Sequence, residues 1–162
     1  MRFGFLTGCL ILIETLSVLA AVPDYSGTWV LNKDRNENQE SGRGMSIEKI
    51  VVRQGKNTFT AEKFMSNPVR GEYSISETVT LDSADCVMDT EMGLRTSQAV
   101  WSSSQNAISI YSQMNTTMGG KAYSIQFHET WKLDSNGDLK LETTRKSPRG
   151  ERYSVQYYSK SE

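Results

Sequence analysis

Histidine and cysteine are both scarce in this chain. Its 162 residues include one histidine, His128, and two cysteines, Cys9 and Cys86. The usual structural zinc site takes about four cysteine or histidine ligands, so we expect no metal centre, and no cofactor is indicated. Nucleophilic catalysis needs a nucleophile beside a base, and the sequence shows no such pair. We therefore expect a protein that is not an enzyme, the alternative being one built around Glu129.

A surplus of charge of either sign is missing as well. The chain carries 18 lysines and arginines against 19 aspartates and glutamates, which gives a formal net charge of -1. Nucleic-acid binding depends on basic residues that neutralise phosphates, and no basic stripe is present. We therefore expect no nucleic-acid partner.

Long apolar runs are absent except near the N-terminus. There, Arg2 precedes an apolar run over residues 3–13, and the segment ends in the small pair Ala20–Ala21. This order is typical of a secretory signal peptide. We therefore expect residues 1–20 to be removed, leaving a secreted or periplasmic domain over residues 21–162.

Two residues of this leader bear on membrane attachment. Glu14 interrupts the apolar run, whereas a transmembrane helix needs about 20 consecutive apolar residues, so we expect no permanent membrane span. The residues before Cys9 resemble a lipoprotein cleavage box, but few precede it, and lipid anchoring through Cys9 is the less favoured alternative. Removal of the leader would leave Cys86 unpaired, and we expect its thiol to be buried.

Short segments of alternating polar and apolar residues make up nearly all of the remaining chain. With the turn residues between them they predict about nine strands. The strands are expected at residues 27–31, 46–53, 58–64, 73–81, 95–101, 107–114, 123–133, 138–146 and 151–158. The polar stretch 32–44 is expected to hold one loose helical turn or a lid loop, and the acidic stretch 82–93 a loop.

The short links between these segments determine the expected architecture. Short links join neighbouring antiparallel strands, and few here are long enough to cross a sheet. A meander removes both of its exposed edges when it closes on itself. We therefore predict an all-β, single antiparallel up-and-down barrel of about eight to nine strands, with a half-open sheet packed on itself as the alternative.

Three segments carry a family resemblance. Gly27-Thr28-Trp29 resembles the Gly-x-Trp first-strand motif of the lipocalins. Residues 129–133, 136–139 and the pair Arg149-Gly150 are similar to segments of exported bacterial lipocalin-like proteins of uncharacterised function.

The resemblance implies a calycin-type barrel with Gly27 and Trp29 as its structural motif. In lipocalins the motif tryptophan closes the barrel floor beneath a basic side chain, which here would be Arg145 or Arg149. The chain departs from typical lipocalins in having no Thr-Asp-Tyr motif and no disulfide pair.

The longest expected strand places one charged residue on an apolar face. That face consists of Tyr123, Ile125, Phe127, Glu129, Trp131 and Leu133. The turn that follows predicts that Trp131 faces Leu141 and Glu129 faces Thr143, so Arg145 lies diagonal to Glu129. A buried carboxylate needs a partner, and Arg145 is the expected one.

Inward polar side chains within an apolar cup predict a ligand site, in which charged groups orient a head group and the wall accepts a tail. The expected ligand-binding residues are Arg95, Trp101, Phe127, Glu129, Trp131, Arg145 and Tyr157. We expect an exported protein that binds a small hydrophobic or amphipathic molecule, as in the wider lipocalin and fatty-acid-binding group. Alternatively, Glu129 and Arg145 only satisfy each other, and a filled barrel serves as an envelope or cell-surface interaction module through exposed residues such as Tyr111 and Tyr158.

Overall fold

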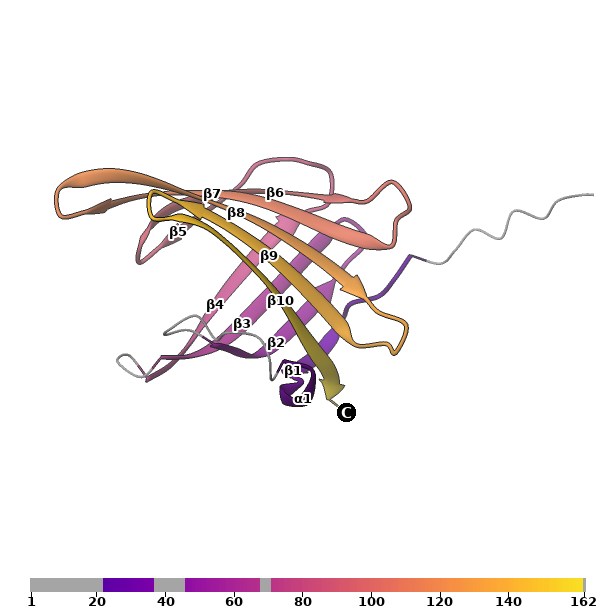
Figure 1. Ribbon diagram of the computed structural model, residues 1–162. Coiled ribbons are helices and arrows are strands. Elements are labelled where there is room, and N and C mark those ends of the chain that lie inside the picture. The colour runs from indigo at the N-terminus through magenta and orange to yellow at the C-terminus, as the bar shows by residue number, and fades with distance from the viewer. Residues whose placement is uncertain (1–21, 37–45, 68–70, 162) are drawn as a thin grey trace, which may run out of the picture.

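The computed structural model describes residues 22–36, 46–67 and 71–161. Nearly all of them belong to one antiparallel sheet of ten strands, beside which lies a single helical turn (Figure 1). The elements are β1 (Gly27–Leu31), α1 (Lys33–Asn36), β2 (Ser46–Gln54), β3 (Thr58–Asn67), β4 (Gly71–Thr80), β5 (Cys86–Thr90), β6 (Gly93–Trp101), β7 (Ala107–Met118), β8 (Lys121–Leu133), β9 (Leu139–Ser147) and β10 (Gly150–Ser161). The predicted all-β class is confirmed.

The strands follow one another as an up-and-down meander. Their order is β4-β3-β2-β1-β10-β9-β8-β7-β6-β5, so the first strand of the chain also pairs with the last. This ladder runs from Thr28 opposite Ser161 to Leu31 opposite Tyr158. Figure 1 shows β1–β4 and β7–β10 facing each other across one interior. The predicted antiparallel meander is therefore confirmed.

The acidic stretch 82–93, expected to be a loop, contains the tenth strand. β5 pairs with β6 from Cys86 opposite Ser97 to Thr90 opposite Gly93. Along β5 half-buried and exposed residues alternate, and Asp89 lies on the exposed side. Edge strands commonly carry such outward charges, so the acidic composition did not prevent pairing. The expected count of about eight to nine strands was too low.

The barrel is nearly closed where the edge strands β4 and β5 approach each other. The backbone N–H of Thr80 donates to Cys86 Sγ at 3.3 Å. We expected the Cys86 thiol to be buried, and the residue is half-buried. Glu77 of β4 accepts a hydrogen bond from Ser97 of β6 and lies 3.1 Å from the guanidinium of Arg95. In these described contacts β4 meets β5 and β6 mainly through side chains. The observed fold is therefore intermediate between the closed barrel and the half-open sheet that the sequence allowed.

Aromatic side chains fill one end of the barrel, which we call the floor. The Phe59 ring packs edge-on against Trp131 at 5.1 Å and against Tyr25 at 6.2 Å between ring centroids. Tyr25 Oη donates to the carbonyl oxygens of Trp131 at 3.0 Å and Asn106 at 3.1 Å. Burial raises the pKa of Tyr25 to about 12, which keeps this hydroxyl protonated as a donor.

The Gly-x-Trp segment lies at this floor, beneath a lysine. Trp29 is buried and donates from Nε1 to the carbonyl of Tyr25 at 2.8 Å, while Lys160 Nζ lies 5.4 Å from its ring centroid. Gly27 has a φ of +136°, and a Cβ there would lie 2.7 Å from Lys160 Cε. The expectation of Arg145 or Arg149 above Trp29 was therefore wrong; the pairing of β1 with the end of β10 brings Lys160 there.

The helical turn α1 packs on the outside of the barrel, against the β8–β9 turn and the C-terminal strand β10. Arg35 NH1 lies 2.6 Å from the carboxylate of Asp134 and 2.7 Å from that of Asp138, and its guanidinium stacks over Tyr157 at 3.8 Å. The helical turn expected within 32–44 is present, and residues 37–45 lie outside the described residues.

The expected leader, with its lipidation candidate Cys9, also lies outside the described residues. Within the described part of the chain, no helix is both long and apolar enough to span a membrane.

Candidate functional site

A buried ion pair crosses the interior above the floor. Lys63 Nζ of β3 lies 2.5 and 2.7 Å from the two carboxylate oxygens of Glu129 on β8, and Trp131 Nε1 donates to the same carboxylate at 3.1 Å. The exposed fractions of Lys63 and Glu129 are 8% and 6%. Burial acts to raise the pKa of Glu129, but the positive charges of Lys63 and Arg95, together with the hydrogen bonds from Lys63 and Trp131, hold that pKa below its usual value.

A second buried polar group lies beside this pair. The guanidinium of Arg95 lies 3.1 Å from Glu77 and donates to Ser112 Oγ at 3.0 Å, and the hydroxyls of Ser97 and Ser112 are hydrogen-bonded at 2.9 Å. Two acidic and two basic side chains thus compensate one another within the barrel, where an unpaired charge would be costly.

The interior face of β8 lies as the sequence predicted. Trp131 faces Leu141 and Glu129 faces Thr143. The expected partner Arg145 instead lies near Phe127, with its Cζ 5.9 Å from that ring centroid. The counter-charge of Glu129 therefore comes from Lys63 on the opposite wall of the barrel. The sequence did not predict this contact, because alternation within one hairpin carries no information on contacts with β3.

The other expected ligand-binding residues divide between floor and outer surface. Trp131 is fully buried in the core and Trp101 packs against Tyr25 at 6.1 Å. Tyr157 contacts Arg35 on the outside, and its neighbour Tyr158 is the buried residue, so the face expected to be inward on this strand was wrong. A one-residue change of register exchanges the two faces of a strand.

An arginine-lined pocket of about 540 Å³ lies at the open end, away from the floor. It is formed mainly by the β9–β10 hairpin, whose described lining residues are Tyr123, Ile125, Arg145, Ser147, Pro148, Arg149, Gly150 and Arg152. Arg145 and Arg152 are directly opposite each other on the two strands. Arg149 lies in the intervening turn, where Gly150 has a φ of +112°. The hairpin therefore brings three arginines, separated in sequence, to one pocket.

Positive charge dominates this arginine pocket, since its described lining residues include no acidic side chain. Arg145 Nε is buried without a hydrogen-bond partner in the described part of the chain. Phe127 separates the pocket from the interior ion pairs, with Arg95 Cζ 5.0 Å from its ring centroid. Planar guanidinium groups bind carboxylate and phosphate oxygens through paired hydrogen bonds. The pocket thus has the chemistry of an anion site.

No known protein family, curated protein or solved structure matches this chain. The described residues contain no group of three or more histidine, cysteine, aspartate or glutamate side chains able to hold a metal. The arginine pocket is therefore identified by its geometry and charge alone.

Of the residues that line the arginine pocket, sequence reasoning named Arg145 as a ligand contact and Arg149 only as a floor residue. Arg152 was missed. The available signal was the turn at residues 147–150, which places Arg145 and Arg152 at equal distances on either side.

Proposed function

We propose that this protein binds a small amphipathic anion at the open end of its barrel. The observation that carries the proposal is the meeting of Arg145, Arg149 and Arg152 at one pocket, among whose described lining residues there is no acidic side chain. A carboxylate or phosphate head group would accept hydrogen bonds from the guanidinium groups. The apolar part would rest on Tyr123 and Ile125, which line the same pocket.

The position of the buried ion pairs supports a site at the mouth rather than deep in the barrel. Lys63 and Glu129 occupy the middle of the interior, and the aromatic core occupies the floor. A ligand that entered further would have to separate these pairs and leave buried charges without partners, which costs several kcal/mol. Of the expected ligand contacts, Arg145 lines this pocket, so we retain it in the proposed site.

The proposal includes export, on the basis of the N-terminal sequence. The order of charge, apolar run and small residues in 1–21 supports a signal peptide. We infer a secreted or periplasmic carrier or sensor, since an anion site without catalytic groups binds and releases its ligand unchanged.

The alternative of an interaction module at a cell surface named Tyr111 and Tyr158 as its first exposed residues. Tyr111 is 51% exposed, whereas Tyr158 is fully buried and is removed from consideration. Other apolar side chains are exposed as well, among them Val87, Leu94 and Tyr153. We favour the anion site because three arginines converge on one pocket.

A calorimetric titration with one tail and four head groups tests the proposal. The full chain is expressed in an exporting host, and the purified protein is titrated with octyl phosphate, octanoate, octanol and octyltrimethylammonium. We expect both anions to bind at least tenfold more tightly than octanol, because charge-assisted hydrogen bonds contribute about 1.5–3 kcal/mol. Equal affinities for octanol and the anions would contradict the proposal.

Matched arginine variants locate the binding. Arg145→Gln and Arg152→Gln should each weaken octyl phosphate binding at least tenfold, whereas Arg53→Gln, an exposed residue of β2, should leave it unchanged. Inorganic phosphate serves as the tail-free control, and binding as tight as that of octyl phosphate would show that the ligand is not amphipathic.

A further inference from the structure

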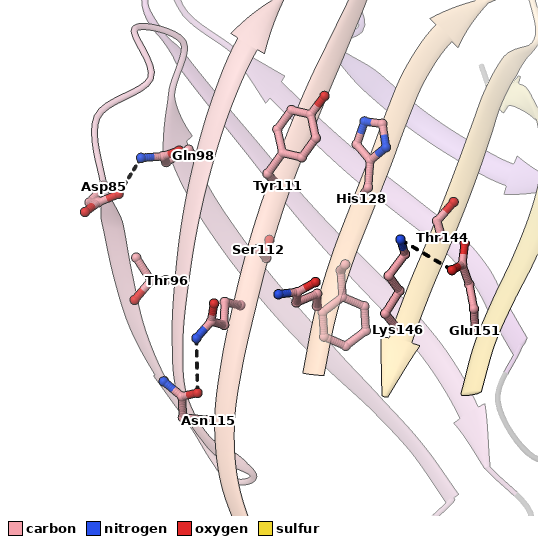
Figure 2. Close-up of a pocket in the computed structure, with 13 residues that line it drawn as sticks. Asp85, Thr96, Gln98, Tyr111, Ser112, Asn115, His128, Thr144, Lys146 and Glu151 are labelled. Carbon is pink, nitrogen blue, oxygen red and sulfur yellow. Dashed lines mark hydrogen bonds and ion pairs between the residues drawn. The ribbon is translucent and has the colours of Figure 1, made fainter. Parts of the chain in front are cut away.

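A second pocket lies on the outer surface of the barrel. It has a volume of about 780 Å³ and extends across β6 to β10 (Figure 2). We call it the outer groove. Most of its lining residues come from the outward-facing positions of the strands. Ser112 and Phe127, which lie between those positions, also contribute to the lining. Its outer lining includes the amides Gln98, Gln113 and Gln126 and the hydroxyl of Thr144.

The charged side chains of the outer groove lie at its two sides. Lys146 Nζ lies 3.4 Å from the carboxylate of Glu151 at one side, and Gln98 Nε2 donates to Asp85 at 2.8 Å at the other, as Figure 2 shows. Between them the described lining consists of uncharged amides, hydroxyls and rings. This arrangement favours an uncharged ligand, in contrast to the arginine pocket.

Two stacked rings stand in the centre of the outer groove. Tyr111 and His128, on the neighbouring strands β7 and β8, are parallel within 6° with centroids 4.3 Å apart, and Figure 2 shows them side by side. Tyr111 remains 51% exposed despite this stacking. His128 Nε2 is buried without a hydrogen-bond partner in the described part of the chain. The pair thus offers an aromatic surface beside an unused nitrogen.

Backbone groups take no part in recognition here. β7, β8 and β9 are each paired on both sides, so their N–H and C=O groups are occupied by the ladders. An extended peptide gains most of its affinity by adding to a free strand edge, and the outer groove crosses the middle of the sheet. A ligand must therefore be recognised through side chains alone.

From these observations we propose that the outer groove binds a neutral oligosaccharide. A sugar hydroxyl both donates and accepts hydrogen bonds, and a carboxamide provides a donor and an acceptor that match two such hydroxyls. The C–H face of a sugar ring packs on an aromatic ring, the role assigned to Tyr111. Because the groove extends across successive strands from β6 to β10, we expect it to hold more than one sugar unit. This site is separate from the arginine pocket and does not depend on it.

The test is a titration followed by ¹⁵N nuclear magnetic resonance. The exported, purified protein is titrated with neutral hexasaccharides of β-1,4-glucose, α-1,4-glucose and β-1,4-N-acetylglucosamine, and with an uncharged octapeptide as comparator. We expect at least one hexasaccharide to give saturable shifts of the side-chain amides of Gln98, Gln113 and Gln126. Tyr111→Ala and Gln126→Ala should each weaken that binding at least tenfold, whereas Thr78→Ala, an exposed change on β4, should not.

Only variants that retain the wild-type thermal midpoint of unfolding are compared. If Tyr111→Ala unfolds the chain, Gln126→Ala replaces it as the test variant, because it removes only an exposed amide. The proposal is overturned if no hexasaccharide binds, if the shifts lie outside the outer groove, or if the octapeptide alone binds. Equal binding by wild type and both groove variants would overturn it as well.

Discussion

Lys63 and Glu129 hold opposite walls of the barrel together. They lie on β3 and β8, strands that are not neighbours in the sheet, and both carboxylate oxygens of Glu129 are within 2.7 Å of Lys63 Nζ. The pair sits between the aromatic floor and the mouth, and it separates a filled half of the barrel from the half that holds the arginine pocket.

Loss of one partner of this ion pair should be far more harmful than loss of both. Lys63→Met leaves the Glu129 carboxylate buried without its main counter-charge, and we expect a loss of about 3–5 kcal/mol in the free energy of unfolding. The double variant Lys63→Met/Glu129→Leu should be more stable than Lys63→Met. Urea unfolding measures both. The more exposed pair Lys140 and Glu142 provides the control, with an expected coupling of about 0–1 kcal/mol. Strictly additive losses at residues 63 and 129 would contradict the cross-barrel tie.

The contribution of Glu129 should disappear in acid. Its pKa in the folded protein is lower than its ordinary value of 4.5, so the folded state favours the carboxylate. This stabilisation is fully present above the ordinary value and is lost as the pH falls through the lowered pKa. The unfolding free energies of wild type and Glu129→Gln should therefore differ most at neutral pH and converge as the pH falls through the lowered pKa of Glu129. A difference that stays constant over this range would show that Glu129 does not titrate differently on folding.

Gly27→Ala should destabilise the barrel for two separable reasons. The φ of +136° is unfavourable for any residue with a Cβ, and that Cβ would also meet Lys160 Cε. We expect a loss of about 1–3 kcal/mol, measured by thermal or urea unfolding. Adding Lys160→Ala should restore the share of the unfolding free energy that is lost through the collision with Lys160. The share that is lost through the unfavourable backbone conformation should remain lost. Full recovery in the double variant would show that the backbone conformation carries no strain.

Removal of the Tyr25 hydroxyl should loosen the floor. Tyr25→Phe deletes the two hydrogen bonds to the carbonyls of Trp131 and Asn106 while keeping the ring between Phe59 and Trp101. We expect a loss of about 0.5–1.5 kcal/mol, the net contribution of a typical hydrogen bond. Hydrogen exchange of the neighbouring amides should increase together with this loss, and unchanged exchange would show that the contacts do not stabilise the floor.

Most of the fold was predictable because the relevant signals are local. Period-two alternation set the strands, and the Asn136-Gly137 turn set the register in which Trp131 faces Leu141. β5 was missed because charged residues weaken the alternation of a short edge strand. The face of β10 was assigned wrongly because exposed Tyr153, with 64% of its surface accessible, resembles a core residue in composition.

The candidate site was less predictable than the fold because its contacts join distant strands. Arg145 was identified as an inward residue, but the partner of Glu129 came from β3. No local pattern encodes which walls of a barrel face each other at a given height. The convergence of Arg149 and Arg152 with Arg145 depends on the hairpin geometry, which a search for charges symmetric about the turn would have detected.

The most direct test of the anion site is the response of Arg145 itself. The side-chain Nε–H signals of ¹⁵N-labelled protein are recorded while octyl phosphate is added, with Arg53 as the internal reference. We predict a saturable shift of the Arg145 signal, because the proposal places the head group against this guanidinium, whose Nε has no hydrogen-bond partner in the described structure. An Arg145 signal that does not move while octyl phosphate saturates the protein would contradict the account.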